Sequence, residues 1–366
     1  MLLYITAEDV FGSDTPRRGG PRPLHTIPST VARLYDLGMR HHIRKAALSW
    51  WEGATLEPMP DWRLDRLVIR TALYWREHLH LEPGGRVLLF GRLGWLWPIV
   101  DFAAMGFAMV PVGVEHVLGD EDLVGVLAHA APRVVFATDA ESAGRLRGLC
   151  EAGRTPGMTI VAEGLPPDVE GLLPLARFLD FGGTLDTAER AQAFRAVSRE
   201  IAPEAEALWH GGPDGLRKLT HEQAMAPIAA GLRTHPAREG DIAYIEGPRV
   251  GLRTRLAWAA SVGDGLTTTV LGREGRTSED VAELRPHKML VSGEWLEGAC
   301  DGRGPRWPAG LDRPWVRRRI RQRLGDRLRW VEATTPVAPA AARSLAAAGL
   351  AIASPMSENI QPPSVH

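Results

Sequence analysis

The residues whose types and spacing could support chemistry gather between Ala207 and His221, a stretch that reads ALWHGGPDGLRKLTH. Gly211, Gly212 and Gly215 lie there between a predicted buried strand and a helix that begins near Thr220. A tight loop followed by a helix N-terminus presents unpaired backbone N–H groups, which can hold a phosphate group. The spacing is not that of a Walker loop, and the same glycines also suit an ordinary turn. From these residues alone, the ordinary surface turn is the favoured interpretation.

The composition is that of an ordinary folded protein. The chain has 366 residues, a formal net charge of −1, 45% hydrophobic residues and 24% charged residues. This near-neutral balance argues against nucleic acid as a partner. The two cysteines cannot form a disulfide framework, and the N-terminus lacks the basic start and apolar core of a secretory signal. No stretch is apolar enough to span a membrane, so we expect a cytoplasmic protein.

Apolar runs alternate with stretches of helical spacing along most of the chain. Runs typical of buried strands occupy residues 46–51, 86–90, 110–114, 134–138, 240–245 and 266–271. Helical spacing covers residues 27–37, 96–105, 120–130, 187–200 and 222–233, and a long helix begins at residue 61. Strands that alternate with helices of this length predict βαβ units and a parallel sheet. The predicted fold class is therefore α/β.

Three local features are predicted from residue type. Ser29 is expected to be the N-cap of the first helix, and residues 52–60 are expected to form a turn region. On the long helix, Asp61, Asp65 and Glu77 are expected to form a solvated polar face.

The central segment also resembles the phosphate loop of the adenylate-forming superfamily, which includes acyl-CoA synthetases, adenylation domains and luciferases. That loop reads Thr-Ser-Gly-Thr-Thr-Gly-x-Pro-Lys-Gly and is followed by Leu-Thr-His. Here the matching residues are Pro213, Gly215, Leu219, Thr220 and His221. The hydroxyl-rich half is replaced by residues 207–211, and Asp214 takes the lysine position. The resemblance implies a degenerate phosphate loop, in which Arg217 or Lys218 would be substitute cations or simply solvated charges.

Scaffold segments extend the resemblance. LEPGGRV at residues 81–87, GFAMVPV at residues 106–112 and APRVVF at residues 131–136 are similar to the opening subdomain of the superfamily. GDIAYI at residues 240–245 resembles a later strand, but the histidine that normally follows is absent after Pro248. These matches imply an α/β fold with the parallel-sheet subdomains of the large N-terminal lobe.

Residues 315–353 resemble a stretch of the long-chain acyl-CoA synthetases, in which Gly-Ala-Pro packs on adenine. Thr334, Thr335 and Pro336 take those positions here. Ser357 and Glu358 take the positions of the threonine that touches phosphate and the glutamate that holds magnesium. The ribose-binding aspartate and the C-terminal domain with its catalytic lysine have no counterpart in the sequence, so the resemblance implies a lobe without that domain. A cluster of seven arginines between residues 317 and 329 is expected to be a solvated helix surface.

Four segments are expected. They are a mobile arm at residues 1–26, a first α/β subdomain at 27–200, a second α/β subdomain with the degenerate phosphate loop at 201–353, and a tail at 354–366.

The leading functional hypothesis is a catalytically degraded acyl-CoA synthetase-like protein, a pseudoenzyme that serves as a structural or binding subunit. It would have a protein partner or form an oligomer, and an acyl or adenylate compound is the expected ligand. No cofactor, metal site or catalytic residue is predicted under this hypothesis. The alternative is one half of a carboxylate or fatty-acid AMP ligase, completed in trans by a separate C-terminal domain and using ATP and magnesium. A third hypothesis is an acyl-binding module without chemistry.

Overall fold

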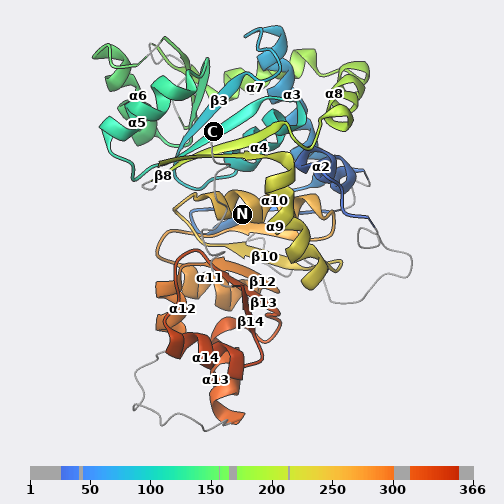
Figure 1. Cartoon of the computed structure of the whole chain (residues 1–366), viewed down its shortest axis with the longest axis vertical. Helices are drawn as coiled ribbons and strands as arrows, with labels where there is room; N and C mark the ends of the chain where they lie inside the picture. Colours follow the sequence, from blue (N-terminus) through green and yellow to red (C-terminus); the bar gives the residue numbers. More distant parts are fainter. Residues whose placement is uncertain are drawn as a thin grey trace, which may run out of the picture.

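The computed structural model describes residues 26–40, 44–155, 157–164, 171–212, 215–300 and 314–353. Within them the chain forms two seven-stranded sheets, with helices between the sheets and on their outer faces (Figure 1). The predicted α/β fold class is confirmed. The arm at 1–26, apart from its last residue, and the tail at 354–366 lie outside the described residues.

The first sheet, at the top of Figure 1, has the strand order β7-β6-β5-β3-β4-β8-β9. Its strands are β3 (Arg86–Gly91), β4 (Val110–Glu115), β5 (Val134–Ala137), β6 (Thr159–Ala162), β7 (Leu173–Pro174), β8 (Glu206–Gly212) and β9 (Gly215–Thr220). All neighbours pair in parallel except β8 and β9. Strand β5 is apolar throughout, and β3 is apolar after Arg86, because helices cover both faces of the sheet (Figure 1).

The second sheet has the order β14-β13-β12-β10-β11-β1-β2. Its strands are β1 (Leu48–Glu52), β2 (Thr55–Met59), β10 (Ile242–Ile245), β11 (Thr268–Leu271), β12 (Lys288–Val291), β13 (Trp330–Ala333) and β14 (Ala351–Ala353). The prediction of a turn at residues 52–60 is wrong for most of its length, since β2 pairs antiparallel with β1 there. The turn itself is short, and Gly53 supplies the positive φ of 62° that it needs.

The two sheets do not divide the chain at residue 200, where the sequence suggested a subdomain boundary. Strands β8 and β9 complete the first sheet, and the N-terminal strands β1 and β2 belong to the second. Each of these hairpins pairs with the edge strand of a sheet formed by residues distant in the sequence. The order of elements along the chain does not reveal which sheet edge a hairpin joins.

Helices cover the outer faces of the two sheets and fill the space between them (Figure 1). The helices are α2 (Val31–Met39), α3 (Asp61–Glu77), α4 (Leu96–Gly106), α5 (Asp120–Ala130), α6 (Ala140–Glu151), α7 (Leu175–Leu185), α8 (Ala188–Glu200), α9 (His221–Thr234), α10 (Leu252–Gly263), α11 (Thr277–Leu284), α12 (Gly293–Cys300), α13 (Pro314–Leu324) and α14 (Pro339–Ala347). Every residue of α4 is buried, and α2, α4 and α10 contact one another between the sheets (Figure 1). Their shared core contains side chains from both sheets.

The starts of α2 and α9 both have side-chain caps. Thr30, rather than the predicted Ser29, caps α2 by accepting a hydrogen bond from the N–H of Arg33 at 3.2 Å. The predicted start of α9 at Thr220 is confirmed, and Thr220 forms a capping box with Gln223.

The predicted polar face of α3 is wrong for two of its three acids. Asp61 is fully buried and accepts from the Arg44 guanidinium at 2.9 Å. Asp65 is buried against Arg195 of α8. Their cationic partners are distant in the sequence, so helical spacing alone could not reveal the burial; Glu77 is exposed as predicted.

Candidate functional site

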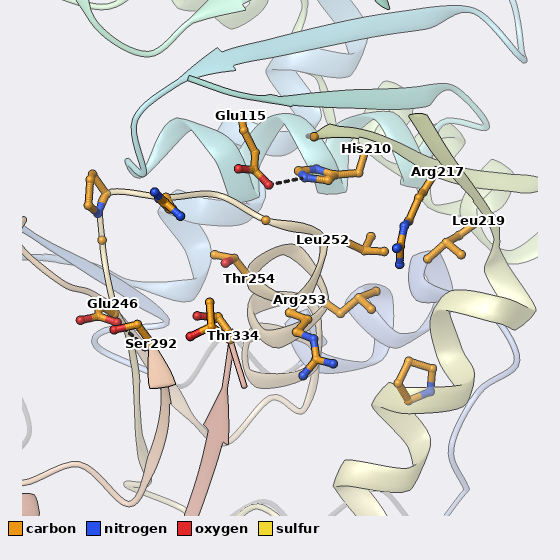
Figure 2. A pocket seen from close by; sticks show the side chains of 18 of the residues that line it. Glu115, His210, Arg217, Leu219, Glu246, Leu252, Arg253, Thr254, Ser292 and Thr334 are labelled. Atoms are coloured by element: carbon orange, nitrogen blue, oxygen red, sulfur yellow. Dashed lines mark hydrogen bonds and ion pairs between the residues drawn. The ribbon is translucent and has the colours of Figure 1, made fainter. Parts of the chain in front are cut away.

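A cavity of about 530 Å³, here called the first cavity, lies where strands of both sheets end. Glu115 and His210 come from β4 and β8, while Glu246, Ser292 and Thr334 follow β10, β12 and β13 directly. The start of α10 lies between these two walls (Figure 2). The carboxyl ends of parallel strands are the usual place for ligands in α/β folds.

The segment that resembles a phosphate loop is a β-hairpin. Strands β8 and β9 pair from Glu206 to Thr220, and Gly212 lies opposite Gly215 at the turn. Gly215 has a φ of 93°, which glycine adopts without strain. Pro213 and Asp214, predicted members of the loop, lie outside the described residues.

Only part of the predicted loop faces the cavity. Gly212 and Gly215 line it, whereas Gly211 packs on α5, where a Cβ would lie 3.1 Å from Val126. The hydroxyl of Thr220 accepts from the N–H of Gln223 and is therefore used as a helix cap.

The two basic residues of β9 point in different directions because side chains alternate along a strand. Arg217 lines the first cavity, as a substitute cation would. Lys218 lies on the other face, with its Nζ 3.9 Å from the centroid of the Trp209 ring and 2.9 Å from Nε2 of His129. The structure thus separates two residues that the sequence treats alike.

The wall formed by the first sheet carries a carboxylate and a buried imidazole. Nε2 of His210 lies 3.4 Å from a carboxylate oxygen of Glu115 (Figure 2). His210 is 5% exposed, and burial lowers its pKa. Its Nδ1 has no hydrogen-bond partner within the described part of the chain.

Behind this wall, an ion pair fixes α10 to the first sheet. Nε of Arg255 on α10 donates to Asp101 on α4 at 3.0 Å, and both side chains are fully buried. The guanidinium also donates to the carbonyl oxygens of Trp209 and Pro111, which lie on β8 and β4. Burial raises the pKa of Asp101, and the neighbouring Arg255 opposes that shift. The start of α10 is thereby held at the cavity.

The wall formed by the second sheet is held together by its own polar groups. Glu246 accepts from the Thr277 hydroxyl at 2.9 Å and from the N–H of Ser292. Thr335, predicted to lie near a nucleotide, lines the cavity together with Thr334, but its hydroxyl accepts from the N–H of Gly293 at 2.8 Å. Pro336 is exposed and is not among the lining residues.

A second, more apolar cavity of about 390 Å³ adjoins the first. It lies between α9, α10 and the strands β10, β12 and β13, and shares Pro227, Arg253 and Leu256 with the first cavity. Arg253 donates to the carbonyl of Ala333 at 3.1 Å and lies 3.7 Å from Glu332, whose pKa burial raises. A guanidinium therefore stands where the polar and apolar chambers meet.

Ser357 and Glu358 lie outside the described residues, so their predicted nucleotide and magnesium contacts remain predictions. Sequence reasoning missed Glu115, His210, Glu246 and Arg253 as lining residues. The first three lie at or near the carboxyl ends of strands, so applying the strand-end rule to each apolar run would have found them.

No helix in the described ranges is long and apolar enough to cross a membrane. Nor do those residues contain a cluster of three or more His, Cys, Asp or Glu side chains placed to hold a metal ion. Within the arginine cluster, Arg321 donates to three backbone carbonyls and Arg329 pairs with Asp241, so these two brace the fold rather than extend freely into solvent.

Residues 63–210 match a protein family described as AMP-binding enzyme. Among solved structures, a fatty acyl CoA synthetase of Mycobacterium tuberculosis is similar over 88% of this chain and 58% of its own, with 16% identity and a TM-score of 0.63. The adenylation domain of a carboxylic acid reductase from Segniliparus rugosus, bound to AMP and a co-purified carboxylic acid, is similar over 88% and 59%, with 14% identity and a TM-score of 0.61. A long-chain-fatty-acid-CoA ligase of Archaeoglobus fulgidus is similar over 87% and 60%, with 13% identity and a TM-score of 0.64.

No curated protein sequence matches the chain. The chain spans about 58–60% of the length of these three solved structures. At these identities the likeness concerns the fold. The resemblance to adenylate-forming enzymes is thereby confirmed for the segment 63–210 and for the two-sheet architecture of their N-terminal lobe.

Proposed function

We propose that the protein is an acyl-CoA synthetase-like pseudoenzyme that serves as a binding subunit in a protein assembly. The observation that carries this proposal is the β8–β9 hairpin at the first cavity. Where the superfamily has a loop of hydroxyl groups, β8 buries Leu208, Trp209 and His210 and has no hydroxyl-bearing side chain. Catalysis of adenylation depends on groups that position and neutralise phosphate, and β8 offers none.

The described residues of the first cavity do not fit a magnesium–triphosphate group. Glu115 places a carboxylate on the wall where phosphate charge would lie, and like charges repel. Lys218 is held on the opposite face of the hairpin by Trp209 and His129. Arg217 remains on the cavity side, but one guanidinium on an exposed strand does not replace a cradle of backbone and hydroxyl donors.

The second cavity supports the binding part of the proposal. Its mostly apolar lining suits the apolar body of a carboxylic acid, and the guanidinium of Arg253, which also contacts Glu332, lies where this cavity meets the first one and could bind the acid group. The cavity is formed by described side chains of α9, α10 and the second sheet. It requires none of the groups that the hairpin lacks.

Calorimetric titration of the wild-type chain tests this function, with caprylate and ATP–magnesium as separate ligands. We expect caprylate to bind and ATP–magnesium to give no heat at millimolar concentration. Ala257→Phe places a ring into the second cavity from α10 and should weaken caprylate binding about tenfold or more. Ala193→Phe, on the exposed face of α8, is the matched control and should leave binding unchanged.

The opposite result would support the ligase hypothesis. If ATP–magnesium binds at micromolar concentration and Glu358→Gln weakens it, the pseudoenzyme proposal is wrong. The assembly is tested separately by analytical ultracentrifugation of the protein purified from its natural source. A stable monomer there would contradict the subunit role without affecting the ligand result.

A further inference from the structure

The carboxylate of Glu115 lies on the wall of the first cavity. Its side chain is 17% exposed, and its nearest polar side-chain contact is Nε2 of His210 at 3.4 Å. No lysine or arginine among the described residues lies within ion-pair distance of it. A carboxylate that is largely withdrawn from water is stable only when donors or a counter-charge satisfy it.

The neighbouring His210 does not supply that counter-charge. Burial lowers the pKa of His210 and the nearby Arg255 lowers it further, while the contact with Glu115 opposes this; the net shift favours the neutral imidazole. Arg255 itself is engaged by Asp101 and by two backbone carbonyls. Among the described residues behind Glu115, neither His210 nor Arg255 supplies a positive charge to it, so a counter-charge would have to come from the cavity side.

The cavity side is kept open by two glycines. A Cβ at Gly212 would lie 3.1 Å from the Glu115 carboxylate oxygen, and one at Gly251 would lie 3.9 Å from it. Gly251 is also the N-cap of α10, where no side chain caps the first N–H groups. The backbone N–H groups at the start of α10 attract the carboxylate, but their combined partial charge amounts to only about half a unit charge. A full positive charge from a ligand would complete the compensation.

Positive side chains line other parts of the same cavity. Arg217 projects from β9, Arg253 from α10, and Arg249 from the segment before that helix (Figure 2 shows the first two). From this separation of charge we infer that the first cavity binds a small zwitterion, with a primary ammonium group at Glu115 and a carboxylate at the arginine side. The ammonium donates to the carboxylate oxygens of Glu115, and the ligand carboxylate lies at the end of the cavity that these arginines make positive. Arg253 also donates to the carbonyl of Ala333 and contacts Glu332, so the carboxylate contact is assigned to Arg249.

This inference goes beyond the proposed function, which concerns an apolar carboxylate in the second cavity. The two are separated by their probes, since caprylate has no amine. Caprylate binding with no preference for an amine would leave the proposed function standing and overturn the zwitterion site. A preference for the amine without caprylate binding would leave the zwitterion site standing and overturn the proposed function.

The first experiment titrates the wild-type chain with γ-aminobutyrate and ε-aminocaproate, each compared with its N-acetyl form and with butyrate or caproate. We expect at least one free amine to bind about tenfold or more tightly than both of its counterparts, as for a charge-assisted hydrogen bond in a desolvated site. Equal affinities for the amine and the N-acetyl forms, or no binding by any of them, would overturn the inference.

The second experiment asks whether Glu115 makes the distinction. Glu115→Gln keeps the size of the side chain and removes the charge, so the amine preference should disappear while the affinity for caproate stays within about twofold. Glu294→Gln, an exposed acid that lines the same cavity, is the matched control and should keep the preference. A preference that survives Glu115→Gln would contradict the assignment, and if that variant does not fold, the wild-type comparison decides.

Discussion

At the scale of single residues, Asp101–Arg255 is an ion pair whose disruption should be costly, because both charges lie in the interior. Both side chains are fully buried, and Arg255 has no other acidic partner among the described residues. Asp101→Ala leaves a guanidinium uncompensated in the interior, so it should lower the free energy of unfolding by about 3–5 kcal/mol. Urea unfolding followed by circular dichroism measures this change.

The control for that prediction is an ion pair on the surface. Arg147 and Glu151 are 3.5 Å apart on α6 and both are exposed. Glu151→Ala should change the free energy of unfolding by less than about 0.5 kcal/mol. If Asp101→Ala and Glu151→Ala lowered the free energy of unfolding by similar amounts, burial of the Asp101–Arg255 pair would not account for the cost of breaking it.

Glu163 gives a prediction about pH. Burial raises the pKa of Glu163 to about 7, while Asp139 and Glu52 add repulsion and the indole N–H of Trp95, 2.6 Å away, opposes the shift. The native carboxyl keeps its proton up to about pH 7, whereas in the unfolded chain it ionises near its ordinary value of 4.5. Stability should therefore fall as pH rises from 4.5 towards 7.

Glu163→Gln removes that dependence. The variant should be more stable than the wild type above pH 7, by up to about 3 kcal/mol, and its stability should vary less between pH 4.5 and pH 7. Denaturant titrations at several pH values measure both effects, with exposed Glu77→Gln as the control. An unchanged slope in Glu163→Gln would mean that this carboxyl ionises normally in the folded protein.

At the scale of elements, the start of α9 fixes the hairpin to the helix that borders both cavities. Thr220 and Gln223 satisfy each other's backbone N–H groups. Thr220→Ala should destabilise the protein by about 1 kcal/mol, and Thr220→Ser, which keeps the hydroxyl, should recover most of the loss. Thermal unfolding of the two variants distinguishes the capping hydrogen bond from the loss of a methyl group.

The elements also show what the sequence could and could not predict. Strands such as β3 and β5 are continuous apolar runs, so their existence and parallel pairing follow from composition. Strand β2 was missed because its Thr-Leu-Glu-Pro-Met sequence is mixed, and only pairing with β1 makes it a strand. At residues 206–220 the glycines and proline alone favour a surface turn, but they do not predict that the residues on both sides of it pair as the antiparallel strands β8 and β9.

The candidate site was predicted only in outline. The segment containing Gly212 and Gly215 does reach the cavity, as do Thr334 and Thr335. Glu115 and His210 are 95 residues apart in the chain. They lie close together because their strands, β4 and β8, pair in the first sheet. Such a contact is a consequence of sheet order, which no local pattern encodes.

At the scale of the whole molecule, the interleaving of the two sheets predicts a single cooperative unfolding unit. The N-terminal hairpin belongs to the second sheet, β8 and β9 belong to the first, and α2, α4 and α10 pack in one core with both. Neither sheet can lose these helices and keep its inner face buried. Segments β5 and β12, one from each sheet, should therefore lose hydrogen-exchange protection at the same denaturant concentration.

Hydrogen exchange measured by mass spectrometry at increasing urea tests this coupling. Asp101→Ala should move the transitions of β5 and β12 down together, because Arg255 joins α10 to α4 and to strands of the first sheet. Exposed Glu151→Ala should move neither. Two separate midpoints in the wild type, or a shift confined to one sheet in Asp101→Ala, would show that the sheets unfold as independent units and that the cavity between them can open without global unfolding.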